Sequence, residues 1–190
     1  MAYLCFSISN SVSPKKWTKV YEETLELADK LELADWDKFY YKGIRSYAYC
    51  KVKEHTKEYD GEPSCFWKAS GEYHYMTDGE YFRLDRKIDK YDKTAGPAIL
   101  GNLDSYIDID SEDFEKQTSN CSIKIWGGPY FLRLLALLCF MESQLKEKIF
   151  IYGNVNKQNC ESAVNLVNKY LKEPIELPAR CDPKRLCNIV

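Results

Sequence analysis

Two glycine-containing turns come directly before predicted helices, and they are the places in this sequence best suited to hold a small ligand. The first spans residues 126–129 and contains Gly127 and Gly128, and the second spans residues 153–156 and contains Gly153, Asn154 and Asn156. Exposed helix N-termini bind anions, and open α/β sheets bind ligands beyond the carboxyl ends of their strands.

Neither turn has the spacing of a known nucleotide loop. The first lacks the G-x-G-x-x-G pattern, and the second lacks the lysine and serine of a P-loop. The simpler interpretation is that the glycines allow a sharp bend while Asn154 or Asn156 caps the helix. We favour this interpretation, and we keep the Gly153 turn as the first candidate for any ligand site.

The histidines and cysteines form no recognisable metal or catalytic motif. The chain has only two histidines, His55 and His74, and Cys181 and Cys187 are spaced more widely than the pair in a zinc knuckle. A catalytic nucleophile needs a base beside it, and no G-x-S-x-G motif is present. We therefore expect no metal, no cofactor and no catalysis through either histidine.

The acidic residues 108–113 resemble a calcium loop only in charge. A loop of the EF-hand type requires glycine at its sixth position and glutamate at its twelfth, where this chain has Asp113 and Ser119. We expect instead a loop that leads into a helix capped by Ser111.

The cysteine pattern predicts reduced thiols. Eight cysteines are scattered without a CxxC pair, no signal peptide is recognisable, and the apolar run 131–141 is too short to span a bilayer. We expect a cytoplasmic protein. Its unpaired cysteines should include Cys5, Cys50, Cys65, Cys121, Cys139 and Cys160.

Composition and charge narrow the class of partner. The net charge of −2 argues against general nucleic-acid binding, whereas 15 tyrosines suit both half-buried strands and a protein contact surface. The positions expected to form that surface are Tyr47, Tyr49, Tyr73, Tyr75 and Tyr81. A weaker alternative is single-stranded nucleic acid stacked on Tyr47 and Tyr49, beside Arg45 and Lys51.

The first half of the chain predicts a strand, a helix and an antiparallel region. Residues 3–9 suit a strand, and Ser13 followed by Pro14 is a strong helix start. Three- and four-residue spacing predicts a buried face for this helix, formed by Trp17, Val20, Tyr21, Thr24, Ala28 and Leu31. From residue 37 to 86 the apolar period is close to two, with a hairpin turn at 77–79. Residues 55–63 and 87–93 are polar and without period, which predicts loops.

The last third of the sequence alternates between helix and strand patterns. Residues 131–141 are apolar nearly all round, which predicts a buried central helix. The strand 149–152, the helix after it and an edge strand at 175–177 between two prolines predict a β-α-β unit with parallel strands. We therefore expect an α+β fold with a mixed sheet, as a single domain over residues 1–180.

Residues 181–190 begin with Asp182-Pro183, a good helix start followed by a short apolar stripe. This pattern suggests a helix that continues into a missing C-terminal region. The sequence favours a non-catalytic protein-interaction or regulatory domain that is the N-terminal part of a longer protein. The alternative is an enzyme or small-ligand-binding protein with its site at the turn after strand 149–152.

Overall fold

A computed structural model describes residues 2–8, 11–34, 36–42, 44–59, 62–70, 81–90, 122–125, 129–146, 148–153 and 155–178. Several sequence predictions lie outside these residues. They concern the 77–79 turn, the acidic run 108–113, the 181–190 helix start, and the residues Tyr73, His74, Tyr75, Gly127, Gly128 and Asn154.

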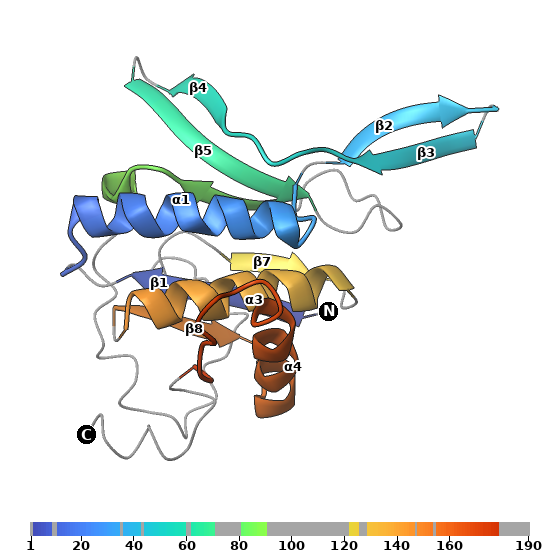
Figure 1. The fold of residues 1–190 in the computed structure, drawn as a ribbon. Coiled ribbons are helices and arrows are strands. Elements are labelled where there is room, and N and C mark those ends of the chain that lie inside the picture. Colours follow the sequence, from blue (N-terminus) through green and yellow to red (C-terminus); the bar gives the residue numbers. More distant parts are fainter. Residues whose placement is uncertain are drawn as a thin grey trace.

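The described chain combines helices with antiparallel sheets, so the α+β class is confirmed (Figure 1). Its elements are β1 (Ala2–Ile8), α1 (Pro14–Lys30), β2 (Trp36–Tyr41), β3 (Ile44–Tyr49), β4 (His55–Tyr59), β5 (Glu62–Ser70), β6 (Tyr81–Asp85), the 3-10 turn η1 (Ile88–Lys90), β7 (Ser122–Ile125), α3 (Pro129–Gln144), β8 (Ile149–Gly153) and α4 (Lys157–Val167). No helix in the described ranges is long and apolar enough to cross a membrane.

Helix α1 begins where the sequence predicts. The Ser13 side chain accepts a hydrogen bond from the Lys16 backbone N–H at 3.3 Å, and Pro14 occupies the first turn, where its missing N–H costs nothing. The predicted buried face is confirmed. Its buried residues are Trp17, Val20, Tyr21, Thr24, Leu27 and Ala28.

The strand order β7-β1-β8 corrects the expectation of a mixed sheet. β1 pairs antiparallel with both neighbours, and every strand pair in the described part of the chain is antiparallel. Because β7 and β8 both run opposite to β1, they are parallel to each other, and α3 joins them. The molecule thus contains a β-α-β connection that is split by β1 and begins at β7, two elements earlier than the predicted unit, which began at β8.

The predicted β-α-β unit over residues 149–177 is wrong, because residues 175–177 form no strand. The Asn168 side chain, which follows α4, bonds both backbone groups of Ile175. Its Oδ1 accepts from the Ile175 N–H at 2.8 Å, and its Nδ2 donates to the Ile175 carbonyl at 3.1 Å. A side chain thus supplies the partners that a neighbouring strand would have given.

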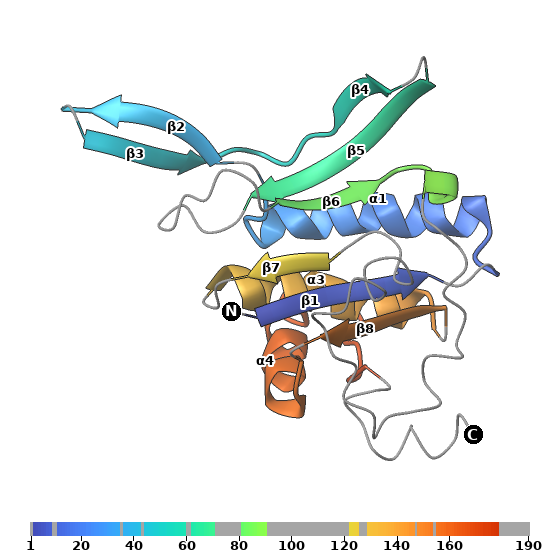
Figure 2. The ribbon, with the colours of Figure 1, turned by 180° about the vertical axis from the view of Figure 1, so that it is seen from behind.

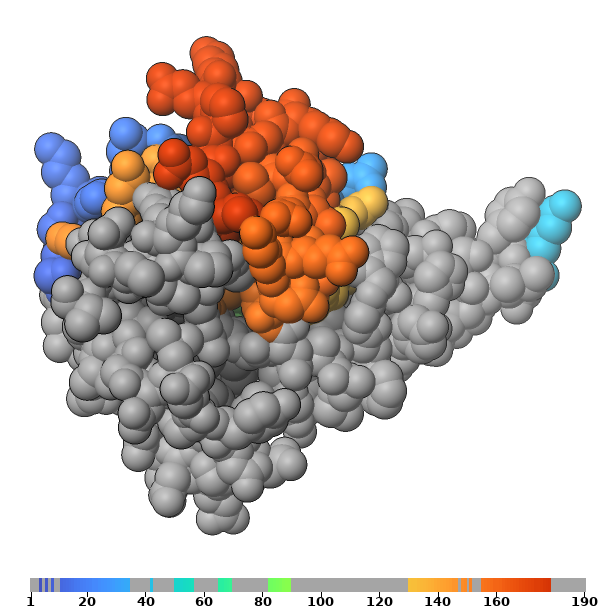
Figure 3. All heavy atoms as spheres, turned by 90° about the horizontal axis from the view of Figure 1, so that it is seen from below, coloured from blue at the N-terminus to red at the C-terminus, as the bar shows by residue number. Residues whose placement is uncertain are grey.

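In Figure 3, α4 and residues 168–178 form a ridge on one face.

Helix α3 lies at the centre of the core, as predicted. Residues Leu134, Leu135, Leu137 and Leu138 are fully buried. Packing of α3 against α1, α4 and β8 explains why its sequence is apolar on nearly every side.

The β4-β5-β6 sheet lies on one side of α1, and the β7-β1-β8 sheet and α3 lie on the other (Figure 2). Trp67 and Ala69 of β5 and Phe82 and Leu84 of β6 are buried, and Phe82 contacts Phe6 of β1 with ring centroids 6.1 Å apart. Residues 55–63, predicted to be a loop, instead contain β4 and the first residues of β5. Their polar sequence suits the edge position of β4.

The β2–β3 hairpin extends beyond the end of α1, away from the helices (Figures 1 and 2). It is a separate two-stranded sheet. The antiparallel middle predicted from the sequence is therefore present, but it is divided between two sheets.

Candidate functional site

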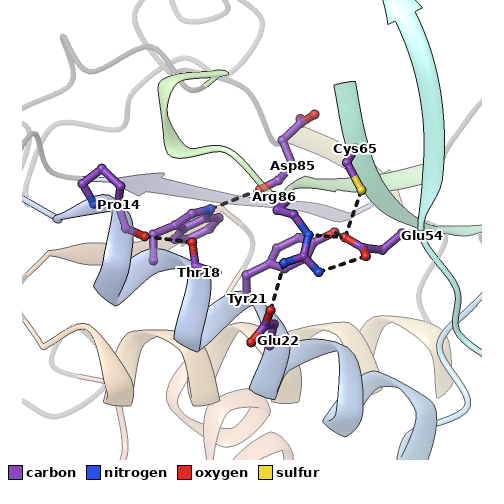
Figure 4. A network of polar contacts seen from close by, with 9 residues as sticks. Pro14, Thr18, Tyr21, Glu22, Glu54, Cys65, Asp85 and Arg86 are labelled. Atoms are coloured by element: carbon purple, nitrogen blue, oxygen red, sulfur yellow. Dashed lines mark hydrogen bonds and ion pairs between the residues drawn. The ribbon is translucent and has the colours of Figure 1, made fainter. Parts of the chain in front are cut away.

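A cluster of polar side chains joins α1 to the β4-β5-β6 sheet (Figure 4). Tyr21 and Glu22 come from α1, Glu54 directly precedes β4, Cys65 lies in β5, and Arg86 directly follows β6. These five residues, which we call the α1–sheet cluster, are joined by hydrogen bonds and ion pairs between their side chains.

Glu54 is the centre of the α1–sheet cluster. Its carboxylate accepts two hydrogen bonds from Arg86, from Nε to Oε1 at 2.8 Å and from Nη2 to Oε2 at 2.9 Å. Oε1 also accepts from the Tyr21 hydroxyl at 2.9 Å and from the Cys65 thiol at 3.2 Å. Arg86 in turn donates from Nη1 to Glu22 at 2.9 Å, and its guanidinium lies 5.0 Å from the centre of the Tyr21 ring.

These contacts fix the charges of the ion pair. The hydrogen bonds from Arg86 are the main reason that the pKa of Glu54 is lowered to about 2. The same bonds, followed by those to Glu22, raise the pKa of Arg86 above its usual value. Both groups therefore stay ionised across the physiological range.

The two neutral members of the cluster are poor candidates for acid, base or nucleophile. Burial is the largest cause that raises the pKa of Tyr21, and the hydrogen bond to Glu54 adds to it. The same two causes raise the pKa of the Cys65 thiol. A reactive cysteine needs thiolate character, and an acid–base catalyst needs a pKa near the working pH. The contacts of the α1–sheet cluster are therefore suited to holding α1 against the β4-β5-β6 sheet.

No feature of the sequence singled out this cluster. Tyr21 was expected on the buried face of α1, where it does lie, but Glu54 and Arg86 are separated by a region of predicted strands and loops. Such a pairing is a tertiary contact, so only the placement of the β4-β5-β6 sheet over α1 shows it.

The residues proposed as a ligand site are only partly described, and those that are described favour capping. Gly153 is the last residue of β8. Asn156 is the N-cap of α4, where its Oδ1 accepts a hydrogen bond from the Asn159 N–H at 2.8 Å. The acceptor that could have met a ligand is thus already used by the helix.

The tyrosines proposed as a contact surface lie on two different sheets. Tyr47 and Tyr49 belong to β3 in the projecting hairpin, whereas Tyr81 is the first residue of β6. Tyr47 and Tyr49 therefore do not share a sheet with Tyr81. Of the two strands, β3 is the one that lies away from the helices (Figure 1).

Of the six cysteines predicted to be reduced, three are confirmed and one is wrong, while Cys121 and the side chain of Cys5 lie outside what the structure describes. Cys50, Cys65 and Cys139 are outside any disulfide. Cys160, on the buried face of α4, is disulfide-bonded. The prediction failed because helical spacing showed that Cys160 is buried, which suits a thiol and a disulfide equally well.

We expect the substitution Cys160→Ser to raise by one the number of thiols that react in denatured, unreduced protein. The change removes a bonded sulfur and releases its partner as a new thiol. Cys139→Ser is the matched control, because it removes a buried thiol and should lower the number by one. Titration with a thiol reagent measures both. An equal decrease in the two variants would show that Cys160 is reduced.

Among the residues with described surroundings, no group of three or more histidine, cysteine or acidic side chains is arranged to hold a metal ion. His55 stacks on Phe66 of the neighbouring strand with ring centroids 5.6 Å apart.

Neither a protein-family model nor a curated protein nor a solved structure matches this chain.

Proposed function

We propose that this chain is a non-catalytic protein-interaction domain and that the β2–β3 hairpin is its contact surface. The single observation that carries the proposal is the hairpin itself. Two strands rich in aromatic residues extend away from the helices rather than covering the core (Figure 1). Aromatic residues are enriched among the anchors of protein interfaces.

The residues on either side of the hairpin are anchored to α1 or buried in the core, which favours a hairpin that is positioned before a partner binds. Leu33 and Ala34, which precede β2, are buried. On the other side, the Val52 N–H donates to the Asp29 carboxylate at 3.3 Å, and Glu54 belongs to the α1–sheet cluster. A surface that is already ordered loses less conformational entropy when it binds.

The alternative of an enzyme or ligand-binding protein with its site at the turn after β8 has less support. Asn156 serves as a helix cap, and the α1–sheet cluster holds no group poised for acid–base work.

The proposed compartment remains the cytoplasm. The thiols Cys50, Cys65 and Cys139 suit it, whereas the Cys160 disulfide argues against it, so the thiol titration bears on this point.

We expect a photo-reactive phenylalanine analogue at Tyr47 or Tyr49 to give a discrete protein adduct in extracts of cells that make the protein. The matched control is the same analogue at Tyr170, which is 41 % exposed and follows α4, far along the chain from the hairpin. Gel electrophoresis and mass spectrometry measure the adducts. Equal labelling from all three positions would mean that the hairpin is not the contact surface.

A further inference from the structure

The hairpin region carries a charge opposite to that of the remaining chain. Residues 36–53 contain five cations, at Lys38, Lys42, Arg45, Lys51 and Lys53, against one acid, Asp37, which gives +4. Since the whole chain has a net charge of −2, all other residues together carry −6. Lys51 and Lys53 follow the hairpin, and residues 36–49 alone carry Lys38, Lys42 and Arg45 against Asp37, so the hairpin is basic although the whole chain is acidic.

Strand register assigns the aromatic and basic positions to one face of the hairpin. Trp36 is paired with Tyr49, Lys38 with Tyr47, and Tyr40 with Arg45. Directly paired positions share a face and successive positions alternate between faces. These six positions, which we call the basic aromatic face, therefore contain four aromatic residues, two cations and no acid.

The opposite face of the hairpin has a different chemistry. Its pairs are Asp37 with Ala48, Phe39 with Ser46, and Tyr41 with Ile44. The only acid of the hairpin is thus on this second face, so the basic aromatic face has a uniform positive sign.

The hairpin also offers strand edges. In the part of the chain that the structure describes, β2 and β3 pair only with each other. An edge strand presents backbone N–H and carbonyl groups that can pair with an added strand of another protein.

We propose that the basic aromatic face binds an acidic, extended segment of a partner protein, which adds its backbone to an edge of the hairpin. This inference rests on the proposed function and names the chemistry of its partner. Carboxylates on alternate residues of the segment all project to one side, so in one orientation they lie on the same side of the sheet as the basic aromatic face and complement its charge.

Two observations favour a protein segment over single-stranded nucleic acid, which could also use aromatic and basic positions. The outer edges of β2 and β3 match a peptide backbone, which donates and accepts along the strand, whereas the phosphodiester backbone of DNA only accepts. In addition, the −6 carried by the remaining chain repels a long polyphosphate more than a short segment with a few carboxylates.

The test uses two fluorescent peptides of about twelve residues, long enough to cover a strand of this length. One alternates glutamate with threonine and the other alternates lysine with threonine, and an oligothymidylate serves as the nucleic-acid probe. Fluorescence anisotropy at about 50 mM salt measures binding, because surface charge pairs are strong there. We expect the acidic peptide to bind at least about tenfold more tightly than either other probe.

The variant Lys38→Glu/Arg45→Glu should weaken binding of the acidic peptide by about tenfold or more. Lys15→Glu/Lys16→Glu is the matched control, since it makes the same change in net charge at exposed positions of α1 and should leave the affinity within about twofold. Circular dichroism melts of both variants verify that they are folded.

The possible outcomes distinguish failure of this inference from failure of the proposed function. Absence of acidic-peptide binding, or equal loss in both variants, overturns this inference and leaves the proposed function to the crosslinking result. Equal binding of the basic peptide overturns the acidic chemistry alone. Tighter binding of oligothymidylate through the hairpin overturns both proposals and makes the hairpin a nucleic-acid surface.

Discussion

Leu135→Ala is expected to lower the free energy of unfolding by about 2–5 kcal/mol, the largest effect predicted for this chain. Leu135 is fully buried near the middle of α3, among residues that α1, α4 and β8 cover. Removing its isopropyl group leaves a cavity that the neighbouring elements, each fixed by other contacts, can only partly fill. Urea denaturation monitored by tryptophan fluorescence measures the change.

Leu132→Ala is the control on the same helix. Leu132 packs against the core but is only partly buried, so its truncation removes less contact area and should cost clearly less. If Leu135→Ala unfolded at the same urea concentration as the parent protein, the central position of α3 would be wrong.

Arg86→Ala is expected to lower the free energy of unfolding by about 1.5–3 kcal/mol, the range for hydrogen bonds to charged groups. Glu54 would lose two hydrogen bonds from the guanidinium, and Glu22 would lose one. Arg133→Ala is the control, because Arg133 makes a single contact of 3.2 Å with the well-exposed Glu32. Such surface pairs contribute about 0–1 kcal/mol. Comparable losses in both variants would show that the α1–sheet cluster is no stronger than a surface pair.

The ion pair also predicts how stability depends on pH. The pKa of Glu54 is about 2 in the folded protein and about 4.3 in an unfolded chain. The pair therefore stabilises the protein fully above the unfolded pKa, and this contribution is lost as the pH falls from there toward 2. Glu54→Gln should flatten the stability profile within that interval. Parallel profiles for parent and variant would locate the acid sensitivity elsewhere.

Features encoded by neighbouring residues could be predicted from the sequence. The Ser13 cap, the buried stripe of α1 and the all-round apolar sequence of α3 depend on spacings of one to four residues. Each of them is present where the pattern indicated. Local periodicity also identified β3 and β8, because alternating or continuous apolar runs suit half-buried and buried strands, respectively.

Features that depend on distant partners could not be predicted. Residues 175–177 have the composition of an edge strand, but Asn168 satisfies the backbone of Ile175, so the segment needs no sheet. Residues 55–59 have no apolar period, yet they form β4 because β5 offers a partner strand. The Cys160 bond and the contact between Glu54 and Arg86 likewise require knowledge of which segments meet in space.

The place of β1 in the middle of its sheet has a consequence for how the protein is made. Leu4 pairs with Ile123 of β7 on one side and with Gly153 of β8 on the other. The first strand of the chain therefore pairs only after two strands from much later in the chain have been synthesised. Contacts between such distant residues slow folding, because a long loop must close before they stabilise anything. A ribosome must therefore pass Gly153 before this sheet can close. Chains released earlier would present the apolar positions Leu4, Phe6 and Ile8 with an unpaired edge, which is a route to aggregation.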